Sequence, residues 1–257
     1  MSRTTESRPA IGVLLKALKL PTVGASFEEV ATKAASDGWT FEQYLAHLLE
    51  LEVEERRRGR VVRNLKRSGL PTDKTLTTLD TKCVPTKIAR QLPTLCDGGF
   101  VDRAENVLAF GNPGTGKSHV VCAIGHELVN KGMEVLFVPT YRLVQRMLVA
   151  KRDLELETLM RRLDRFDVVI LDDIGYVQQD REEMEVLFTF LAERYERRSV
   201  MITSNLVFSQ WDKIFKDAMT TAAAIDRVVH HSTILELTGK SYRTETAKAR
   251  NIKEAKA

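Results

Sequence analysis

The stretch GNPGTGKS at residues 111–118 decides the fold class of this chain. It matches the phosphate-binding pattern G-x-x-x-x-G-K-[ST] at every fixed position. Glycine reaches backbone angles that are closed to other residues, so the N–H groups of such a loop can approach phosphate oxygens. An apolar run, Val107–Phe110, precedes the loop, and an apolar helical pattern follows it. This arrangement predicts a strand, a nucleotide-binding loop and a helix whose N-terminus faces the phosphates.

We expect the loop and the start of its helix to bind ATP. Lys117 would supply a cation to the β- and γ-phosphates, and the Ser118 hydroxyl would be a ligand of Mg²⁺. The residues expected to contact the nucleotide are Gly111, Asn112, Pro113, Gly114, Thr115, Gly116, Lys117, Ser118 and His119.

Two further apolar runs end in polar residues. Val168–Leu171 leads into Asp172 and Asp173, and a later run leads into Asn205. Because the carboxyl ends of parallel strands meet at one edge of a sheet, we expect these groups to lie beside the loop. Asp172 is the expected Mg²⁺ ligand, Asp173 a candidate general base and Asn205 a candidate for orienting the attacking water. Turn-forming acidic and asparagine residues are the alternative interpretation.

From about residue 100 onward, short apolar runs typical of strands alternate with segments that have a helical pattern. The expected strands are Asn106–Phe110, Glu134–Val138, Asp167–Leu171, Val200–Thr203 and Thr233–Leu237. The expected helices are 117–131, 140–163, 182–197 and 220–230. Alternating units of this kind predict an α/β fold with a five-stranded parallel sheet covered by helices on both faces.

The first 69 residues have a helical pattern. Ser26 with Glu29, and Thr40 with Gln43, have the spacing of a capping box. The expected organisation is a helical N-terminal domain for partner or DNA contact at 1–69, a connector and the start of the ATPase module at 70–99, and the ATPase core with a short charged tail at 100–257.

The composition excludes several classes of protein. The 257 residues carry 39 Lys and Arg against 35 Asp and Glu, a net charge of +4 that is compatible with nucleic-acid binding. The apolar runs are too short to span a membrane, and the N-terminus lacks the layout of a signal peptide. The 3 cysteines form no C-x-x-C pair, so a disulfide framework or a zinc finger is not expected. We expect a cytoplasmic protein.

A basic run lies at residues 56–67. Its seven cations among twelve residues are Arg56, Arg57, Arg58, Arg60, Arg63, Lys66 and Arg67. Such a run binds duplex DNA by releasing counterions from the phosphates. Glu52 and Glu54 are placed to pair with it along a helix, which is the alternative interpretation. A second candidate DNA contact contains Arg142 and Arg146.

The chain resembles the IstB-like transposition helper ATPases of bacterial insertion sequences. These belong to the AAA+ group, near the helicase loader DnaC and the initiator DnaA. The motifs that carry the resemblance are GNPGTGKSHV at 111–120, LDDIGY at 171–176, RYERRSVMITSN at 194–205, FSQW at 208–211, AAIDRVVHH at 223–231 and GKSYR at 239–243. Together they cover nearly the whole chain, along with N-terminal matches at 41–52 and 70–76.

The resemblance implies a role for several residues. Lys117 and Ser118 match the Walker A motif, Asp172 the Walker B acid and Asn205 the first sensor residue. Arg227 matches the arginine finger, which reaches the nucleotide of the neighbouring subunit. Arg243 is a second candidate for an arginine at a subunit interface.

The sequence departs from the AAA+ pattern in two places. Many members have Asp-Glu in the Walker B motif where this chain has Asp172-Asp173; the shorter second carboxylate leaves the base role of Asp173 open and predicts slow hydrolysis. The segment after Asn205 is also too short for a full C-terminal helical lid.

The resemblance implies a bacterial, DNA-associated, Mg²⁺-dependent ATPase. It would oligomerise through its ATP interfaces on duplex DNA, largely independently of sequence, and help a cognate transposase to select or use its target. The alternatives are a DnaC-like loader of a replicative helicase and, in another class, a nucleotide-gated DNA scaffold without hydrolysis.

Overall fold

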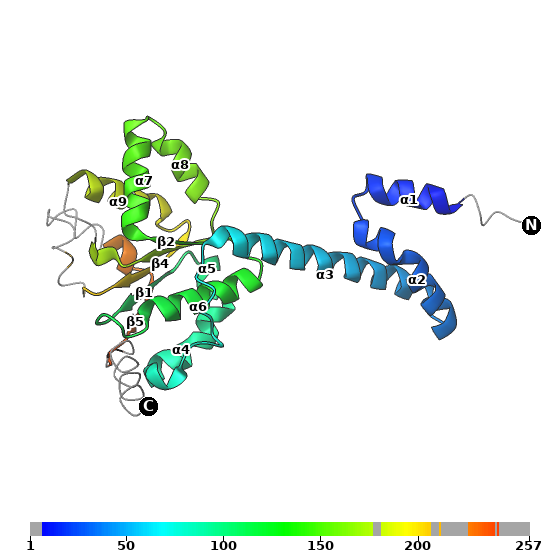
Figure 1. Ribbon diagram of the computed structural model, residues 1–257, viewed down its shortest axis with the longest axis horizontal. Coiled ribbons are helices and arrows are strands. Elements are labelled where there is room, and N and C mark those ends of the chain that lie inside the picture. The colour runs from blue at the N-terminus through cyan, green and yellow to red at the C-terminus, as the bar shows by residue number, and fades with distance from the viewer. Residues whose placement is uncertain (1–6, 177–180, 207–210, 212–225, 240, 242–257) are drawn as a thin grey trace, which may run out of the picture. The chain divides into compact units, whose positions relative to one another are not determined.

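A computed structural model describes residues 7–176, 181–206, 211, 226–239 and 241. The chain divides into two compact units, Met1–Arg63 and Asn64–Ala257, and each is described by itself. Helix α3 (Phe41–Ser68) contributes to both units (Figure 1). No helix in the described part of the chain is long and apolar enough to cross a membrane.

The first unit is helical, as the sequence predicted. It consists of α1 (Ser7–Ala17), α2 (Pro21–Asp37) and α3 as far as Arg63. Proline presets the backbone for the first turn of α2, and Gly38 ends this helix in the left-handed conformation with φ 66°. The small core of the unit is formed by the buried side chains of Val23, Val30 and Leu48.

One of the two expected capping boxes is confirmed. The N–H of Thr40 donates to Oε1 of Gln43 at 2.8 Å, and the N–H of Gln43 donates to Oγ1 of Thr40 at 3.3 Å. The box expected at Ser26 and Glu29 is wrong, because α2 begins five residues earlier, at Pro21. Ser26 lies inside the helix, where its hydroxyl donates to a backbone carbonyl.

The second unit contains a five-stranded parallel sheet, which confirms the expected fold class. The strands are β1 (Asn106–Phe110), β2 (Val135–Pro139), β3 (Val168–Asp172), β4 (Ser199–Ser204) and β5 (Ser232–Glu236). Their order across the sheet is β2-β3-β4-β1-β5. The expected bounds of each strand agree with the observed bounds to within one residue. The strand β1 that precedes the phosphate-binding loop therefore lies beside β4, which is next to β3.

Helices cover both faces of this sheet (Figure 1). One face carries α6 (Lys117–Asn130), against which α4 (Thr86–Asp97) packs, and the short α5 (Gly99–Asp102) follows α4. The other face carries α7 (Thr140–Arg152), α8 (Leu156–Leu163) and α9 (Arg181–Arg194). Because successive strand residues point to opposite faces, Val169 and Leu171 join the cluster under α7–α9, whereas Ile170 lies against Gly125 of α6.

Two of the expected helices are corrected. The helix expected at 182–197 is α9, which ends at Arg194. The single helix expected at 140–163 is two helices, because α7 ends at Arg152 and Leu154 adopts a left-handed backbone with φ 57°. The N–H of Glu155 then donates to the carbonyl of Ala150 at 2.7 Å, which closes the helix end. The helix α4 and the 3-10 turns at Thr81–Cys83 and Ile174–Tyr176 were not expected. Most of the helix expected at 220–230 lies outside the described residues.

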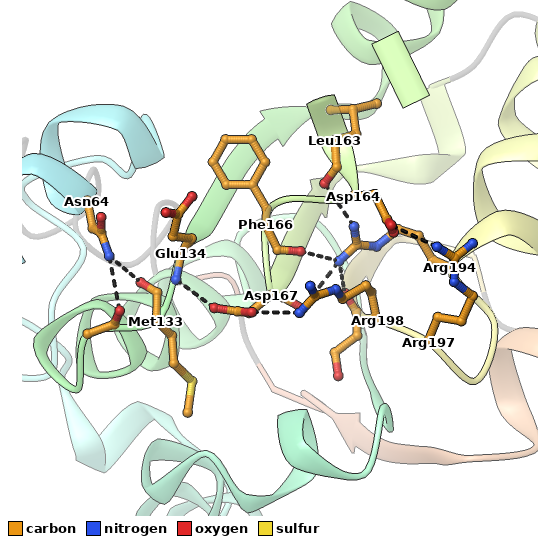
Figure 2. A network of polar contacts seen from close by, with 12 residues as sticks. Asn64, Met133, Glu134, Leu163, Asp164, Phe166, Asp167, Arg194, Arg197 and Arg198 are labelled. Atoms are coloured by element: carbon orange, nitrogen blue, oxygen red, sulfur yellow. Dashed lines mark hydrogen bonds and ion pairs between the residues drawn. The ribbon is translucent and has the colours of Figure 1, made fainter. Parts of the chain in front are cut away.

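A buried arginine ties the amino ends of β3 and β4 together (Figure 2). Arg194 is 3% exposed, and its guanidinium donates to the carbonyls of Leu163 (3.1 Å), Phe166 (2.9 Å) and Ser199 (2.9 Å). Burial lowers the pKa of Arg194 to about 10. Leu163 is the last residue of α8, Phe166 lies just before β3, and Ser199 is the first residue of β4. One side chain therefore fixes three segments at this edge.

The same network reaches the end of α3 (Figure 2). Nδ2 of Asn64 donates to the carbonyls of Gly132 and Met133, each at 3.1 Å. The next residue, Glu134, donates its N–H to Asp167, whose carboxylate also accepts from Arg198 at 2.7 Å. The end of α3, from Asn64 onward, is therefore part of the second unit and is anchored at the amino ends of β2 and β3.

We predict that Leu154→Gly stabilises the protein by about 0.5–1 kcal/mol, because glycine adopts the left-handed backbone without strain. Leu154 is 94% exposed, so no packing is lost. Urea unfolding monitored by circular dichroism measures the change. Leu154→Ala is the control, since it removes the same exposed side chain but keeps the strain. Equal stability of the two variants would contradict the prediction.

Candidate functional site

The phosphate-binding loop connects the end of β1 to the start of α6. Two of its glycines have left-handed backbones, with φ 82° at Gly114 and φ 94° at Gly116. A Cβ atom at Gly114 would also overlap the hydroxyl of Ser241. The path of the loop therefore requires glycine at both positions, as the sequence motif does.

Lys117 places the positive charge of its side chain inside this loop. It is the first residue of α6 and is 8% exposed. Its ammonium group donates to the carbonyls of Gly111 (2.7 Å) and Asn112 (2.9 Å) and to Oδ1 of Asn205 (2.6 Å). The N-terminus of α6 adds its positive dipole end at the same place. The arrangement is suited to bind a phosphate group.

The carboxylate of Asp172 lies beside the start of α6. Its Oδ1 accepts hydrogen bonds from Oγ of Ser118 at 2.6 Å and from Oγ1 of Thr203 at 2.7 Å. Hydroxyl and carboxylate oxygens are the ligands that Mg²⁺ prefers, and Mg²⁺ commonly takes only one or two of them together with water and phosphate. Ser118 and Asp172 therefore fit a Mg²⁺ ion bound next to a nucleotide. Within the described ranges, no group of three or more His, Cys, Asp and Glu side chains forms a metal site of its own.

Asp173 has an unusual backbone conformation that favours aspartate at this position. Its φ is 61°, in the left-handed region that aspartate and asparagine enter more readily than other residues with side chains. Its Oδ1 accepts from Nδ2 of Asn205 at 3.2 Å. Burial raises the pKa of Asp173, and the charge of Asp172 raises it further. The Asp-Asp pair in place of Asp-Glu thus agrees with the local backbone conformation.

A cavity of about 190 Å³ adjoins the loop. One side is formed by Gly114, Gly116, Lys117, Ser118 and His119. The other side is formed by the connector residues Lys74, Thr78, Leu79, Asp80, Cys83 and Val84. The sequence predicted a connector at 70–99 but assigned none of these side chains to a site. A larger groove of about 580 Å³ lies between α8 and α9 and contains no residue of the phosphate-binding loop.

The histidines of α6 attach the connector to the nucleotide site. Nε2 of His119 lies 3.1 Å from the carbonyl of Thr75 and 3.2 Å from Oγ1 of Thr78. Nε2 of His126 lies 2.9 Å from the carbonyl of Pro71. His119 therefore lines the cavity, and it also fixes the segment opposite the loop. His119 and His126 are seven residues apart and so lie on one face of α6, and this spacing was the only hint of their role that the sequence contained.

Arg227 lies at the opposite edge of the sheet from the loop. Nδ2 of Asn106, the first residue of β1, donates to the carbonyl of Val228 at 3.1 Å. The loop follows the last residue of β1, and a strand of this length spans about 17 Å. The Arg227 guanidinium lies 5.0 Å from the centre of the Phe188 ring. A contact between Arg227 and a bound phosphate would therefore have to be made between subunits. Arg243 and the segments 207–210, 212–225 and 242–257 are outside the described residues, so the expectation that the chain has no full lid is not tested.

Part of the basic run on α3 is paired with acids. Arg56 lies 2.8 Å from Glu52, Arg58 lies 3.5 Å from Glu54, and Arg67 lies 3.6 Å from Glu134. The alternative interpretation of an internally paired helix face therefore holds for Arg56 and Arg58. Among the residues that are described, the cations of the run without a carboxylate at ion-pair distance are Arg57, Arg60, Arg63 and Lys66. On α7, Arg142 and Arg146 are both exposed.

Comparisons with known proteins agree with the resemblance. A model of the family described as IstB-like ATP binding protein matches residues 13–250. A relative in Sinorhizobium fredii, named as an insertion sequence ATP-binding protein, is 42% identical over 238 residues, covering 92% of this chain and 80% of its own length. A relative in Pseudomonas aeruginosa, named as an ATP-binding protein of insertion sequence IS21, is 37% identical over 234 residues, covering 90% of this chain and 87% of its own.

Solved structures resemble the fold. DnaI superposes with a TM-score of 0.55 at 18% identity, covering 66% of this chain and 95% of that one. DnaA from Aquifex aeolicus, bound to AMPPCP, superposes with a TM-score of 0.55 at 16% identity, covering 73% of this chain and 56% of that one. At such identities the likeness concerns the fold alone, and it confirms the expected α/β fold with a five-stranded parallel sheet.

We predict that Asp173→Asn stabilises the folded protein at pH 7 by about 1 kcal/mol, because it removes the charge of a partly buried carboxylate next to Asp172. The raised pKa means that folding favours the protonated carboxyl, so the ionised form destabilises the fold above the ordinary aspartate pKa. Asparagine also tolerates the left-handed backbone. Urea unfolding at pH 7 and near pH 4 measures the gain, which should shrink at the lower pH as Asp173 becomes protonated. The exposed Asp102→Asn is the control, and an equal gain there would contradict the explanation.

Proposed function

Because this chain belongs to the family of IstB-like ATP-binding proteins, we propose that it is an ATP-dependent, DNA-binding regulator of transposition. In this proposal, ATP and Mg²⁺ assemble several copies on duplex DNA, and the assembly helps a separate transposase to select or use its target. The observation that carries the proposal is the hydrogen-bonded set at the carboxyl edge of the sheet, formed by Lys117, Ser118, Asp172, Asp173 and Asn205. The names of the relatives supply the context of an insertion sequence.

The proposed reaction is hydrolysis of ATP to ADP and phosphate. Lys117 would bind the β- and γ-phosphates, and Ser118 with Asp172 would hold Mg²⁺, which would supply positive charge to the phosphate oxygens. Asp173 accepts a proton from the attacking water, and its raised pKa favours that role. Asn205 connects the two halves, since it accepts from Lys117 and donates to Asp173, so it can orient the water between them.

The proposed assembly places Arg227 against the nucleotide of a neighbouring subunit. A guanidinium is the side chain best suited to stabilise the charge on a phosphate group held by another chain. Support comes from its location at the amino edge of the sheet, away from the loop of its own chain. ATP would then be sensed only when two subunits are in contact, which couples nucleotide binding to oligomerisation.

We predict that the wild-type protein forms a large complex only with both ATP and a duplex of about six helical turns, and that Arg227→Ala abolishes it. Light scattering of the purified protein with ATP, ADP or no nucleotide measures the size. Arg103→Ala is the matched control, because Arg103 is an exposed arginine near the start of β1 that pairs with Glu105. A complex that forms with single strands and a helicase instead would favour the helicase loader. Assembly by Arg227→Ala at wild-type levels would exclude the finger role.

The proposed DNA contact includes the outer surface of α7 and α8. Arg146 and Arg162 both line a groove of about 360 Å³ between these helices. Neither has an ion-pair partner among the described residues, whereas Arg161 lies 3.9 Å from Glu157 and Lys151 lies 3.0 Å from Glu185. Unpaired guanidinium groups are available to bind phosphates, and such contacts carry little sequence information.

We predict that Arg146→Ala weakens binding to duplexes of unrelated sequence several-fold and lowers the slope of log affinity against log salt by about 1. Fluorescence anisotropy at several salt concentrations measures both quantities in the presence of ATP. Arg161→Ala, on the neighbouring helix, removes a cation that is already paired and should leave the slope nearly unchanged. If both variants behave alike, or neither affects binding, the α7 and α8 surface is not the contact.

A further inference from the structure

We propose that Thr203 positions both acids of the ATPase site, by orienting the Asp172 carboxylate for the metal ion and by fixing the backbone of Asp173. This inference rests on the proposed ATPase function and deepens it, since the sequence motifs assign no role to this residue. Thr203 is a positioning residue in this proposal, because its hydroxyl contacts the two acids and not the phosphates.

Thr203 is held near the carboxyl end of β4, the middle strand of the sheet. It is the fifth residue of β4, which pairs with β3 on one side and with β1 on the other, and it is 1% exposed. Its Oγ1 lies 2.7 Å from Oδ1 of Asp172 and 2.8 Å from the backbone nitrogen of Asp173. A β-branched side chain in a strand has few rotamers, so the hydroxyl has a fixed direction.

The direction of both hydrogen bonds follows from their chemistry. A backbone N–H only donates, and an ionised carboxylate only accepts. The hydroxyl of Thr203 must therefore accept from Asp173 and donate its single proton to Asp172. No other orientation satisfies both partners, so the hydroxyl fixes the metal-binding carboxylate relative to the next residue of the chain.

The bond to Asp173 constrains a strained residue. A left-handed backbone at a residue with a side chain costs about 1 kcal/mol, and Asp173 has φ 61°. The N–H of Asp173 is held by Thr203, and its carboxylate is held by Asn205. Both contacts favour the conformation that directs this carboxylate toward Asn205 and the loop.

Thr203 also connects the two halves of the site. Ser118 and Asp172 form the half that fits Mg²⁺, whereas Asn205 and Asp173 form the half suited to orient water. The continuous path of polar contacts runs through Lys117, Asn205, Asp173, Thr203, Asp172 and Ser118. Loss of the Thr203 hydroxyl breaks this path between the two acids.

The chain provides a matched control in Thr140. This residue is also a buried threonine, 0% exposed, and its hydroxyl also contacts Asp172. It donates to the backbone carbonyl of Asp172 at 3.0 Å, however, and not to the carboxylate. Thr→Val at either position removes one buried hydroxyl at nearly constant volume, but only Thr203→Val releases the carboxylate.

The test uses the full-length protein and binding of a fluorescent ATP analogue, which needs no turnover, during titration with MgCl₂. Loss of one hydrogen bond to a charged group predicts that Thr203→Val needs about tenfold more Mg²⁺ for half-maximal binding. Binding in EDTA should change by less than about twofold, since the phosphate-binding loop is untouched. Thr203→Ser should restore the wild-type requirement, and Thr140→Val should retain it while losing thermal stability.

Two results would overturn the assignment. One is an unchanged Mg²⁺ requirement in folded Thr203→Val; the other is an equal shift in Thr140→Val, which indicates general loosening. If Thr203→Val does not fold, Thr203→Cys decides, because a thiol is a weaker hydrogen-bonding group in the same place and should give an intermediate shift. Wild-type binding that does not depend on Mg²⁺ is a separate outcome, which rejects the metal site of the proposed function and with it this assignment.

Discussion

Parallel pairing of β1, β3 and β4 is the constraint on which the whole site depends. Because these strands run in the same direction and lie next to one another, their carboxyl ends carry the phosphate-binding loop, Asp172 and Thr203 to one edge of the sheet. Strands are about 4.8 Å apart, so short side chains on neighbouring strands can bond directly. Ser118 completes the group from the first turn of α6. A change of register by one residue would turn Thr203 away from Asp172 and break its contacts with both acids.

The two edges of the sheet have different tasks. At the carboxyl edge, polar side chains such as Lys117 and Ser118 line a cavity. At the same edge, Asp173 is a titratable residue with a left-handed backbone. At the amino edge, Arg194 and Asn64 satisfy backbone carbonyls and fix the ends of strands and helices. A guanidinium that is buried to this extent stabilises the fold only because carbonyl oxygens surround it. Arg227 lies at this amino edge, next to Val228, whose carbonyl accepts from Asn106 at the start of β1.

The identity of the second Walker B residue illustrates how a local backbone angle selects a side chain. The sequence alone presented Asp173 as a departure that weakened its case as a base. In the structure, the residue lies at φ 61°, a conformation that aspartate enters readily, and its carboxylate accepts from Asn205. The departure is therefore compatible with a functional acid. Its pKa is raised by burial and by Asp172, which is the environment expected of a group that accepts a proton.

The sequence by itself determined the features that depend on neighbouring residues. The loop at 111–118, the five strands and the capping box at Thr40 are encoded by local spacing and by the backbone preferences of a few residues. The break at Leu154 was missed because a leucine there gives no helix-ending signal, and the box at Ser26 was wrong because Pro21 begins the helix earlier. Only the tertiary structure decided that Thr203 contacts both acids, that His119 holds the connector, and that Arg227 lies far from its own loop. These contacts join residues distant in the chain, and strand order and register, which no local pattern specifies, bring them together.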